Sequence, residues 1–159
     1  MHFRKESYYM YAEISKDAVL FYRALQDIWC AEKTFTGSPN NAVWSCCQAV
    51  EKSIKGLLQC YGIDAGGTHD LSILLEDLEK ETELSRQTVS VIHDLARYDQ
   101  RLRYKNLKSD PTVEEAKTAV NDTKEVMNEI GKHPKCSTYM REANEVYDKQ
   151  LKASISSDA

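Results

Sequence analysis

The sequence is poor in glycine and proline, with only 6 and 3 among 159 residues. Because these residues mark turns and interrupt regular elements, their scarcity favours long helices over a fold of many short strands. No run approaches the ~18 apolar residues of a membrane span. The first residues, MHFRKESYYMYAEISKD, carry charges where a signal peptide has an apolar region. We therefore expect a cytoplasmic protein with no membrane contact.

The sequence also lacks the spacings of a metal, redox or phosphate-loop site. Its five cysteines form no C-x-x-C pair, and it has no His-x-x-x-His or Glu-x-x-His motif and no glycine-rich phosphate loop. We expect reduced cysteines in the core, no metal and no cofactor. The net charge of −4 argues against a protein whose whole surface binds nucleic acid, although local patches can still do so.

Helical periodicity is what the sequence does have. The clearest stripe, in 40–61, steps by four and three residues through Val43, Cys47, Val50, Ile54, Leu57 and Tyr61. Similar stripes predict helices at 8–29, between Leu71 and Leu78, and at about 85–102, 112–130 and 138–152. The prediction is an all-α, up-and-down bundle of four or five helices in residues 1–135, followed by a C-terminal helix and frayed tail in 136–159.

Helix ends and packing are also predicted from single residues. Thr68 and Ser85 are expected to cap the third and fourth helices, and Thr112 begins a capping box. Gly56, inside the second helix, costs about 1 kcal/mol relative to alanine, and close approach of another helix would explain it. The fourth helix, 85–102, has apolar residues on two faces and is expected to be the most buried.

Two charged groups flank the loop that follows the second helix. Glu51 and Lys55 are four residues apart in the orientation that favours an ion pair, and Lys52 lies beside them. His69 and Asp70 follow the loop, where Asp70 complements a helix dipole. These residues are either a solvated face with a capped helix, or one wall of a pocket for an anionic ligand.

The segment ARYDQRLRYKNLK, residues 96–108, is basic in an acidic protein. It contains one acid, Asp99, and two tyrosines, Tyr98 and Tyr104. Its five cations are Arg97, Arg101, Arg103, Lys105 and Lys108. Arginine binds phosphate through two hydrogen bonds and tyrosine stacks on bases, which indicates a nucleotide or RNA surface. The alternative is a basic helix end that complements its own dipole.

The run WSCCQAVEKSIKGLLQCYGIDAGGTHDLSILLEDL resembles the HEPN domain family. In that family a helix reading roughly A-x-Q-A-x-E-K-x-x-K-x-L-L precedes a glycine-containing loop and T-H-x-L-x-x-L-L. The matching residues are Gln48, Glu51, Lys52, Lys55, Leu57, Leu58, Gly62, Thr68, His69, Leu71 and Leu75. Arg103 and Tyr104 resemble the start of the family's R-Y-P segment, with Lys105 in place of the proline. The likeness covers about residues 40–130.

The resemblance implies an up-and-down helical bundle that is usually a homodimer and mostly prokaryotic. Members are nucleotide-binding modules, partners of minimal nucleotidyltransferases, or parts of toxin–antitoxin and defence systems. Others are metal-independent ribonucleases with an arginine followed, after four to six residues, by a histidine. Counted from Arg103, those positions hold Lys108, Ser109 and Asp110. Arg86 and His93 satisfy the spacing but lie a helix length earlier, and we interpret that match as coincidence.

The leading hypothesis is therefore a non-catalytic module that binds a nucleotide, a separately encoded nucleotidyltransferase, or both. Its expected site is one groove that gathers residues from three helices: Glu51, Lys52, Lys55, His69, Asp70, Arg101, Arg103 and Tyr104. The alternative is a ribonuclease with Arg103 on the phosphate and His69 or His93 as the proton carrier. A third hypothesis is a purely structural helical dimer.

Overall fold

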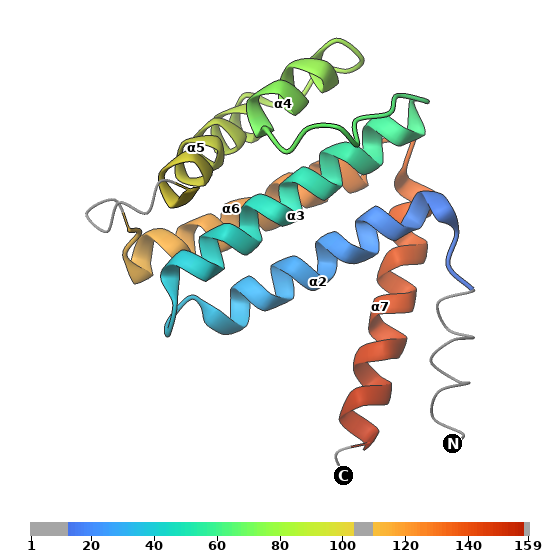
Figure 1. The fold of residues 1–159 in the computed structure, drawn as a ribbon. Coiled ribbons are helices and arrows are strands. Elements are labelled where there is room, and N and C mark those ends of the chain that lie inside the picture. The colour runs from blue at the N-terminus through green and yellow to red at the C-terminus, as the bar shows by residue number, and fades with distance from the viewer. Residues whose placement is uncertain (1–12, 104–109, 158–159) are drawn as a thin grey trace.

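The computed structural model describes residues 13–103 and 110–157, and in these the regular elements are all helical (Figure 1). A 3-10 helix, η1 (Lys16–Ala18), leads into α2 (Val19–Thr34) and α3 (Pro39–Cys60). The short α4 (Leu71–Glu79) is followed by α5 (Arg86–Arg103), α6 (Val113–Gly131) and α7 (Ser137–Ser157). The predicted all-α bundle is confirmed. None of the described helices is long and apolar enough to cross a membrane.

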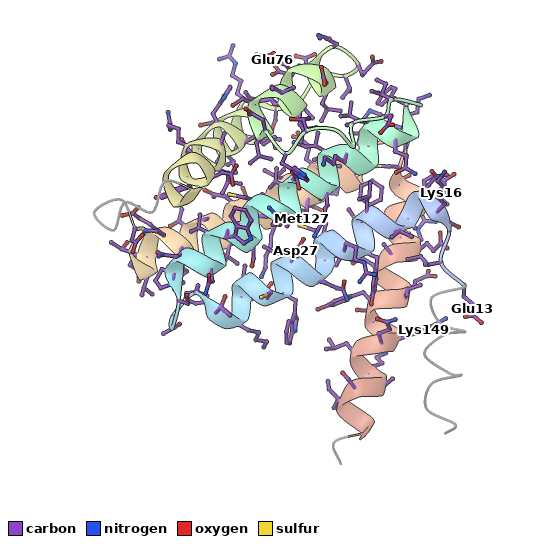
Figure 2. All side chains as sticks on the ribbon, in the orientation of Figure 1. Glu13, Lys16, Asp27, Glu76, Met127 and Lys149 are labelled. Carbon is purple, nitrogen blue, oxygen red and sulfur yellow. The ribbon has the colours of Figure 1, made fainter. Side chains whose placement is uncertain are left out.

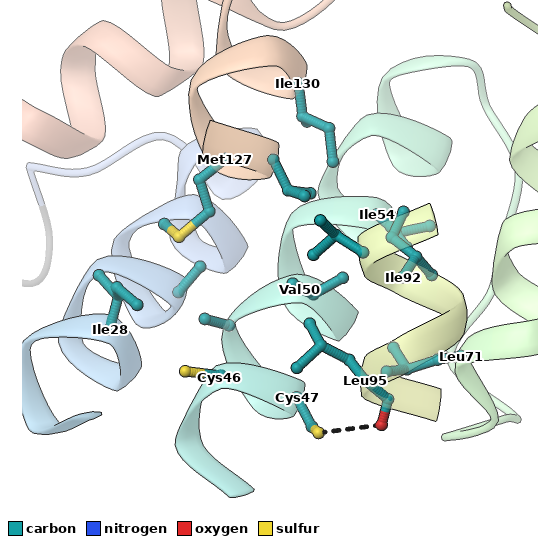
Figure 3. Close-up of a cluster of buried hydrophobic side chains, with 14 of the residues drawn as sticks. Ile28, Cys46, Cys47, Val50, Ile54, Leu71, Ile92, Leu95, Met127 and Ile130 are labelled. Atoms are coloured by element: carbon teal, nitrogen blue, oxygen red, sulfur yellow. Dashed lines mark hydrogen bonds between the residues drawn. The ribbon is translucent and has the colours of Figure 1, made fainter. Parts of the chain in front are cut away.

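Helix α3 is the centre of the bundle, because it contacts α2, α4, α5 and α6. Figure 3 shows Val50 and Ile54 of α3 between Ile92 of α5 and Ile130 of α6, all buried in one core. The expectation that residues 85–102 form the most buried helix is wrong. Ile92, Ala96, Val91 and Leu95 of the two stripes are buried, but Val89 and Tyr98, one from each stripe, are only partly buried. The central helix α3 is the more buried one, since α5 packs only against α3, α4 and α6.

Gly56 lies where α3 packs closely against Phe21 of α2. A Cβ atom at Gly56 would lie 2.7 Å from Cζ of Phe21 on α2 and 2.9 Å from its Cε1. These separations are well inside the ~3.5 Å of ordinary carbon–carbon contact. The expected reason for a glycine here, close approach of another helix, is therefore confirmed. Phe21 itself is fully buried.

The predicted helix boundaries are confirmed at some ends and wrong at others. The first helix was predicted over 8–29, but α2 begins at Val19 and continues to Thr34; residues 8–12 lie outside the described residues. Ser85 accepts a hydrogen bond from the Thr88 N–H at 3.1 Å, which confirms it as a cap. The cap of α4 is Asp70 and not Thr68.

Helix α7 packs mainly on α2 and diverges from the long axis of the bundle (Figure 1). Tyr22 of α2 stacks edge-on against Tyr147, with ring centroids 6.4 Å apart, and its hydroxyl donates to Gln150. Ala143 is fully buried. The helix continues to Ser157, through part of the tail whose composition predicts fraying.

Candidate functional site

The strongest polar feature of the core is a buried carboxylate on α3. Glu51 is only 4% exposed. Its Oε1 atom lies 2.8 Å from Nδ1 of His69 and 3.8 Å from Nζ of Lys55. The Lys55 side chain is 12% exposed and that of His69 is 67% exposed. One buried oxygen thus joins a cation of the same helix to a histidine of the following loop.

The loop after α3 brings His69 back to Glu51. Gly62 has a φ of +79°, which L side chains rarely adopt, and the N–H of Ile63 donates to the Leu58 carbonyl at 3.0 Å, so the chain reverses at the helix end. Figure 1 shows the loop running back along α3 before α4 begins. Glu51 lies more than two turns before the last residue of α3, so His69 fastens the far end of this loop to the helix.

Lys55 also lines a pocket of about 680 Å³, which we call the α3–loop pocket. Its other lining residues come from η1, α2, the end of α3 and the loop: Lys16, Asp17, Leu20, Gln59 and 62–66. Lys16 lies at the end of the bundle where α3 finishes (Figure 2). Two acids of the pocket already have partners, since Asp17 accepts from Gln59 at 3.0 Å and Asp64 accepts from the Gly66 N–H at 2.9 Å. The pocket thus places Lys16 and Lys55 beside two carboxylates that are hydrogen-bonded to neutral donors.

Two of the residues predicted for the groove have other partners. Nζ of Lys52 lies 2.5 Å from Oδ2 of Asp27 on α2, because successive residues of a helix point in different directions. Asp70 accepts from the N–H groups of Ser72 and Ile73 at 2.9 and 3.4 Å, as an N-cap does. The structure therefore brings together Glu51, Lys55 and His69, whereas Lys52 and Asp70 bind elsewhere.

The described part of the basic segment, residues 96–103, lies toward the opposite end of α3. Sγ of Cys47 lies 3.5 Å from the Leu95 carbonyl oxygen, which sets the register of α3 and the antiparallel α5 (Figure 3). At 1.5 Å per residue, Glu51 and the Arg101 backbone are about 15 Å apart along the helix axes. The side chains of Arg101 and Arg103, and all of Tyr104, lie outside the described residues. Their convergence with Glu51 stays a prediction.

A second groove, here called the α5 groove, has a volume of about 740 Å³. Arg86, His93 and Arg97 line it along one face of α5, together with residues of the preceding segment from Glu79 to Leu84. Arg86 and His93 are exposed, and Arg97 forms an ion pair with Asp94. Seven residues make about two helical turns, so the Arg86–His93 spacing noted in the sequence places both side chains on the same face.

An acidic pocket between α5 and α6 was not predicted. It measures about 600 Å³ and includes Asp94, Glu114, Glu115 and Asp122 around an apolar floor. Burial raises the pKa of Asp122, and the neighbouring Glu125 and Asp94 raise it further. No sequence signal identifies this pocket, because its acids come from two helices with no fixed spacing. In the described part of the chain, no group of three histidine, cysteine or acidic side chains could hold a metal ion.

The helical bundle, with Glu51, Lys55 and His69 gathered beside α3, can be compared with known families. The family model described as the HEPN domain matches residues 18–133, and the chain belongs to this family. The crystal structure of TT1696 from Thermus thermophilus is similar, with a TM-score of 0.63, 22% identity, and coverage of 74% of this chain and 97% of that one. ST0689, an archaeal HEPN homologue, gives a TM-score of 0.59 at 22% identity, with coverage of 74% and 96%. No curated protein is significantly similar in sequence.

Proposed function

We propose that this protein is a non-catalytic HEPN module that binds the phosphate groups of a nucleotide in the α3–loop pocket. The observation that carries the proposal is the position of Lys55, which lines the pocket while its ammonium group lies 3.8 Å from the buried Glu51. A lysine held in place by a buried carboxylate loses less side-chain freedom when an anion binds.

The composition of the pocket wall suits a nucleotide. Lys16 and Lys55 supply two positive charges for phosphate oxygens. Leu20 and Ile63 give an apolar surface for a base or sugar, and the glycine-rich loop lets a ligand approach the backbone closely. The absence of a histidine four to six residues after Arg103 in the sequence favours binding over RNA cleavage at the family's motif.

Isothermal titration with a panel of nucleoside mono-, di- and triphosphates tests this proposal. Lys55→Ala and Lys16→Ala are each expected to weaken binding about 10-fold, the equivalent of ~1.4 kcal/mol for a lost charge-assisted contact. Lys117→Ala is the matched control, because Lys117 is an exposed lysine of α6 outside the pocket. If the wild-type protein binds none of the nucleotides, the proposal fails and a purely structural helical dimer becomes the better interpretation.

The proposed partner is a separately encoded nucleotidyltransferase, in a toxin–antitoxin or defence system, because such an enzyme binds nucleotides itself. Family membership supports this part of the proposal, as it does the homodimer. Light scattering coupled to gel filtration measures the mass directly, and a homodimer would give twice 18.2 kDa. A monomer at all concentrations would contradict the dimer but not the nucleotide site.

A metal-independent endoribonuclease is the second candidate, and one observation favours it. Arg86 and His93 line the same α5 groove with Arg97. An arginine there would bind the phosphodiester while the histidine moves a proton during attack by the 2′-hydroxyl, leaving a 2′,3′-cyclic phosphate. Incubation of labelled RNA with EDTA, using wild type, Arg86→Ala, His93→Ala and Arg103→Ala, tests this. Cleavage by wild type that either α5 variant abolishes would replace the binding proposal, and intact RNA in every sample would leave it in place.

A further inference from the structure

Lys55 and His69 share one acceptor atom. Both side chains approach Oε1 of Glu51, but at different distances: His69 Nδ1 lies at 2.8 Å and Lys55 Nζ at 3.8 Å. The first is a hydrogen bond, whereas the second is an ion pair beyond the ~3.2 Å limit of ordinary hydrogen bonding. Glu51 is therefore bound most closely by the residue from the loop, and its helix neighbour is held more loosely.

This difference matters because Glu51 is buried. A buried carboxylate that loses its hydrogen-bond donor is strongly destabilised and takes the nearest available donor. Lys55 is that donor, since its flexible stem needs to shift by only about 1 Å to reach hydrogen-bond distance. An ammonium group drawn onto Glu51 is less available to an anion in the pocket.

We propose that His69 is a positioning residue that sets the anion affinity of the α3–loop pocket: by hydrogen-bonding Glu51 it keeps the Lys55 ammonium group at the longer ion-pair distance, from which it can also bind phosphate. This inference rests on the proposed function, because it concerns the same pocket. His69 is not among the residues named as lining the pocket, so its proposed effect on the anion passes through Glu51. Residues 62–66, which line the pocket, and His69, which bonds Glu51, thus belong to the same loop between α3 and α4.

Other charges near the pocket do not take over this role. Asp17 is bonded by Gln59, and Asp64 is bonded by the backbone of its own loop. Asp70, next to His69, accepts from the first N–H groups of α4. Glu51 is therefore the carboxylate that determines where the Lys55 ammonium group lies.

The test is a double-mutant cycle with titration of inorganic pyrophosphate and of ADP. His69→Ala is expected to weaken both about 5- to 10-fold, whereas His69→Asn, whose amide nitrogen takes the place of Nδ1, restores most of the affinity. In a Glu51→Gln background, which lacks the competing charge, His69→Ala is expected to change the affinity less than about 2-fold. His69 is exposed, so its variants should fold; thermal melting by circular dichroism checks this. If Glu51→Gln does not fold, the comparison of alanine with asparagine at position 69 decides alone.

The outcomes separate this inference from the proposed function. If wild type binds neither probe, both are overturned. If wild type binds and His69→Ala binds equally well, the pocket stands and the role of His69 is refuted. If His69→Ala weakens binding by the same factor with and without Glu51, or if His69→Asn is as weak as His69→Ala, the residue acts on the ligand or on the loop and not through Glu51, which also refutes the inference.

Discussion

Replacement of Gly56 by alanine sets two effects of similar size against each other. Alanine is favoured over glycine in a helix interior by about 1 kcal/mol. Against this, the new Cβ would lie 2.7 Å and 2.9 Å from two ring atoms of Phe21. Phe21 is fully buried, so its ring cannot move into solvent to relieve the contact. Overpacking of this kind costs about 1–3 kcal/mol.

The expected net result is a loss of about 1 kcal/mol of folding free energy, or a fall of about 2–4 °C in the melting temperature. Gly37→Ala is the control. Nothing lies within 4 Å of a Cβ built at Gly37, so this variant should be neutral or more stable.

Urea unfolding followed by circular dichroism measures both variants. A second check is coupling: Phe21→Leu alone should destabilise, and in the Gly56→Ala background it should destabilise by at least 1 kcal/mol less, as roughly expected for residues in direct contact. A Gly56→Ala protein more stable than wild type, or additive effects of the two substitutions, would show that the close approach of α2 and α3 does not limit the residue at position 56.

Three further predictions concern the cap of α4, the buried thiols and one end of the bundle. Asp70→Ala should cost about 1 kcal/mol in urea unfolding while Asp70→Ser costs little, and neither should change nucleotide affinity. Burial raises the pKa of Cys46 and Cys136 from 9.0 to about 12, so these thiols ionise at lower pH in the unfolded chain than in the folded one. Their contribution to stability should be constant below pH 9 and fall as the pH rises from about 9 toward 12, and Cys46→Ala and Cys136→Ala should reduce this fall in the urea midpoint. His133 lies 3.0 Å from the Tyr61 hydroxyl, so His133→Ala should lower stability by about 1 kcal/mol; an unchanged melting temperature would contradict this.

Much of the fold could be predicted from local signals. The stripe from Val43 to Tyr61 identified α3, and Ser85 marked the start of α5. Errors came where local signals compete. Thr68 and Asp70 are both good capping residues, but Asp70 caps α4, whereas Thr68 accepts only from the N–H of Asp70 in the turn before the helix. The apolar residues before Val19 suggested a longer α2 than the structure has.

The candidate site was only partly predictable, because side-chain direction depends on packing. The spacing of Glu51 and Lys55 indicated an ion pair, and the structure has one. The expected groove included both Glu51 and His69, but nothing in the sequence indicated that Glu51 is buried or that the two side chains bond directly. Lys16 was not recognised either, since a lysine in a charged segment has no distinguishing pattern before η1 brings it to the pocket. Contacts between side chains that are far apart in the sequence depend on how the helices pack, which no local pattern encodes.

The position of α7 has a consequence for the solubility of shortened forms of this protein. The match to the family model ends at residue 133, before α7 begins at Ser137. Tyr22 of α2 is 3% exposed and packs on Tyr147 of that helix. A premature stop codon that removed α7 would expose this apolar face and favour aggregation. We therefore expect α7 to be needed for solubility even if the helix takes no part in binding, because it covers the surface of α2 around Tyr22.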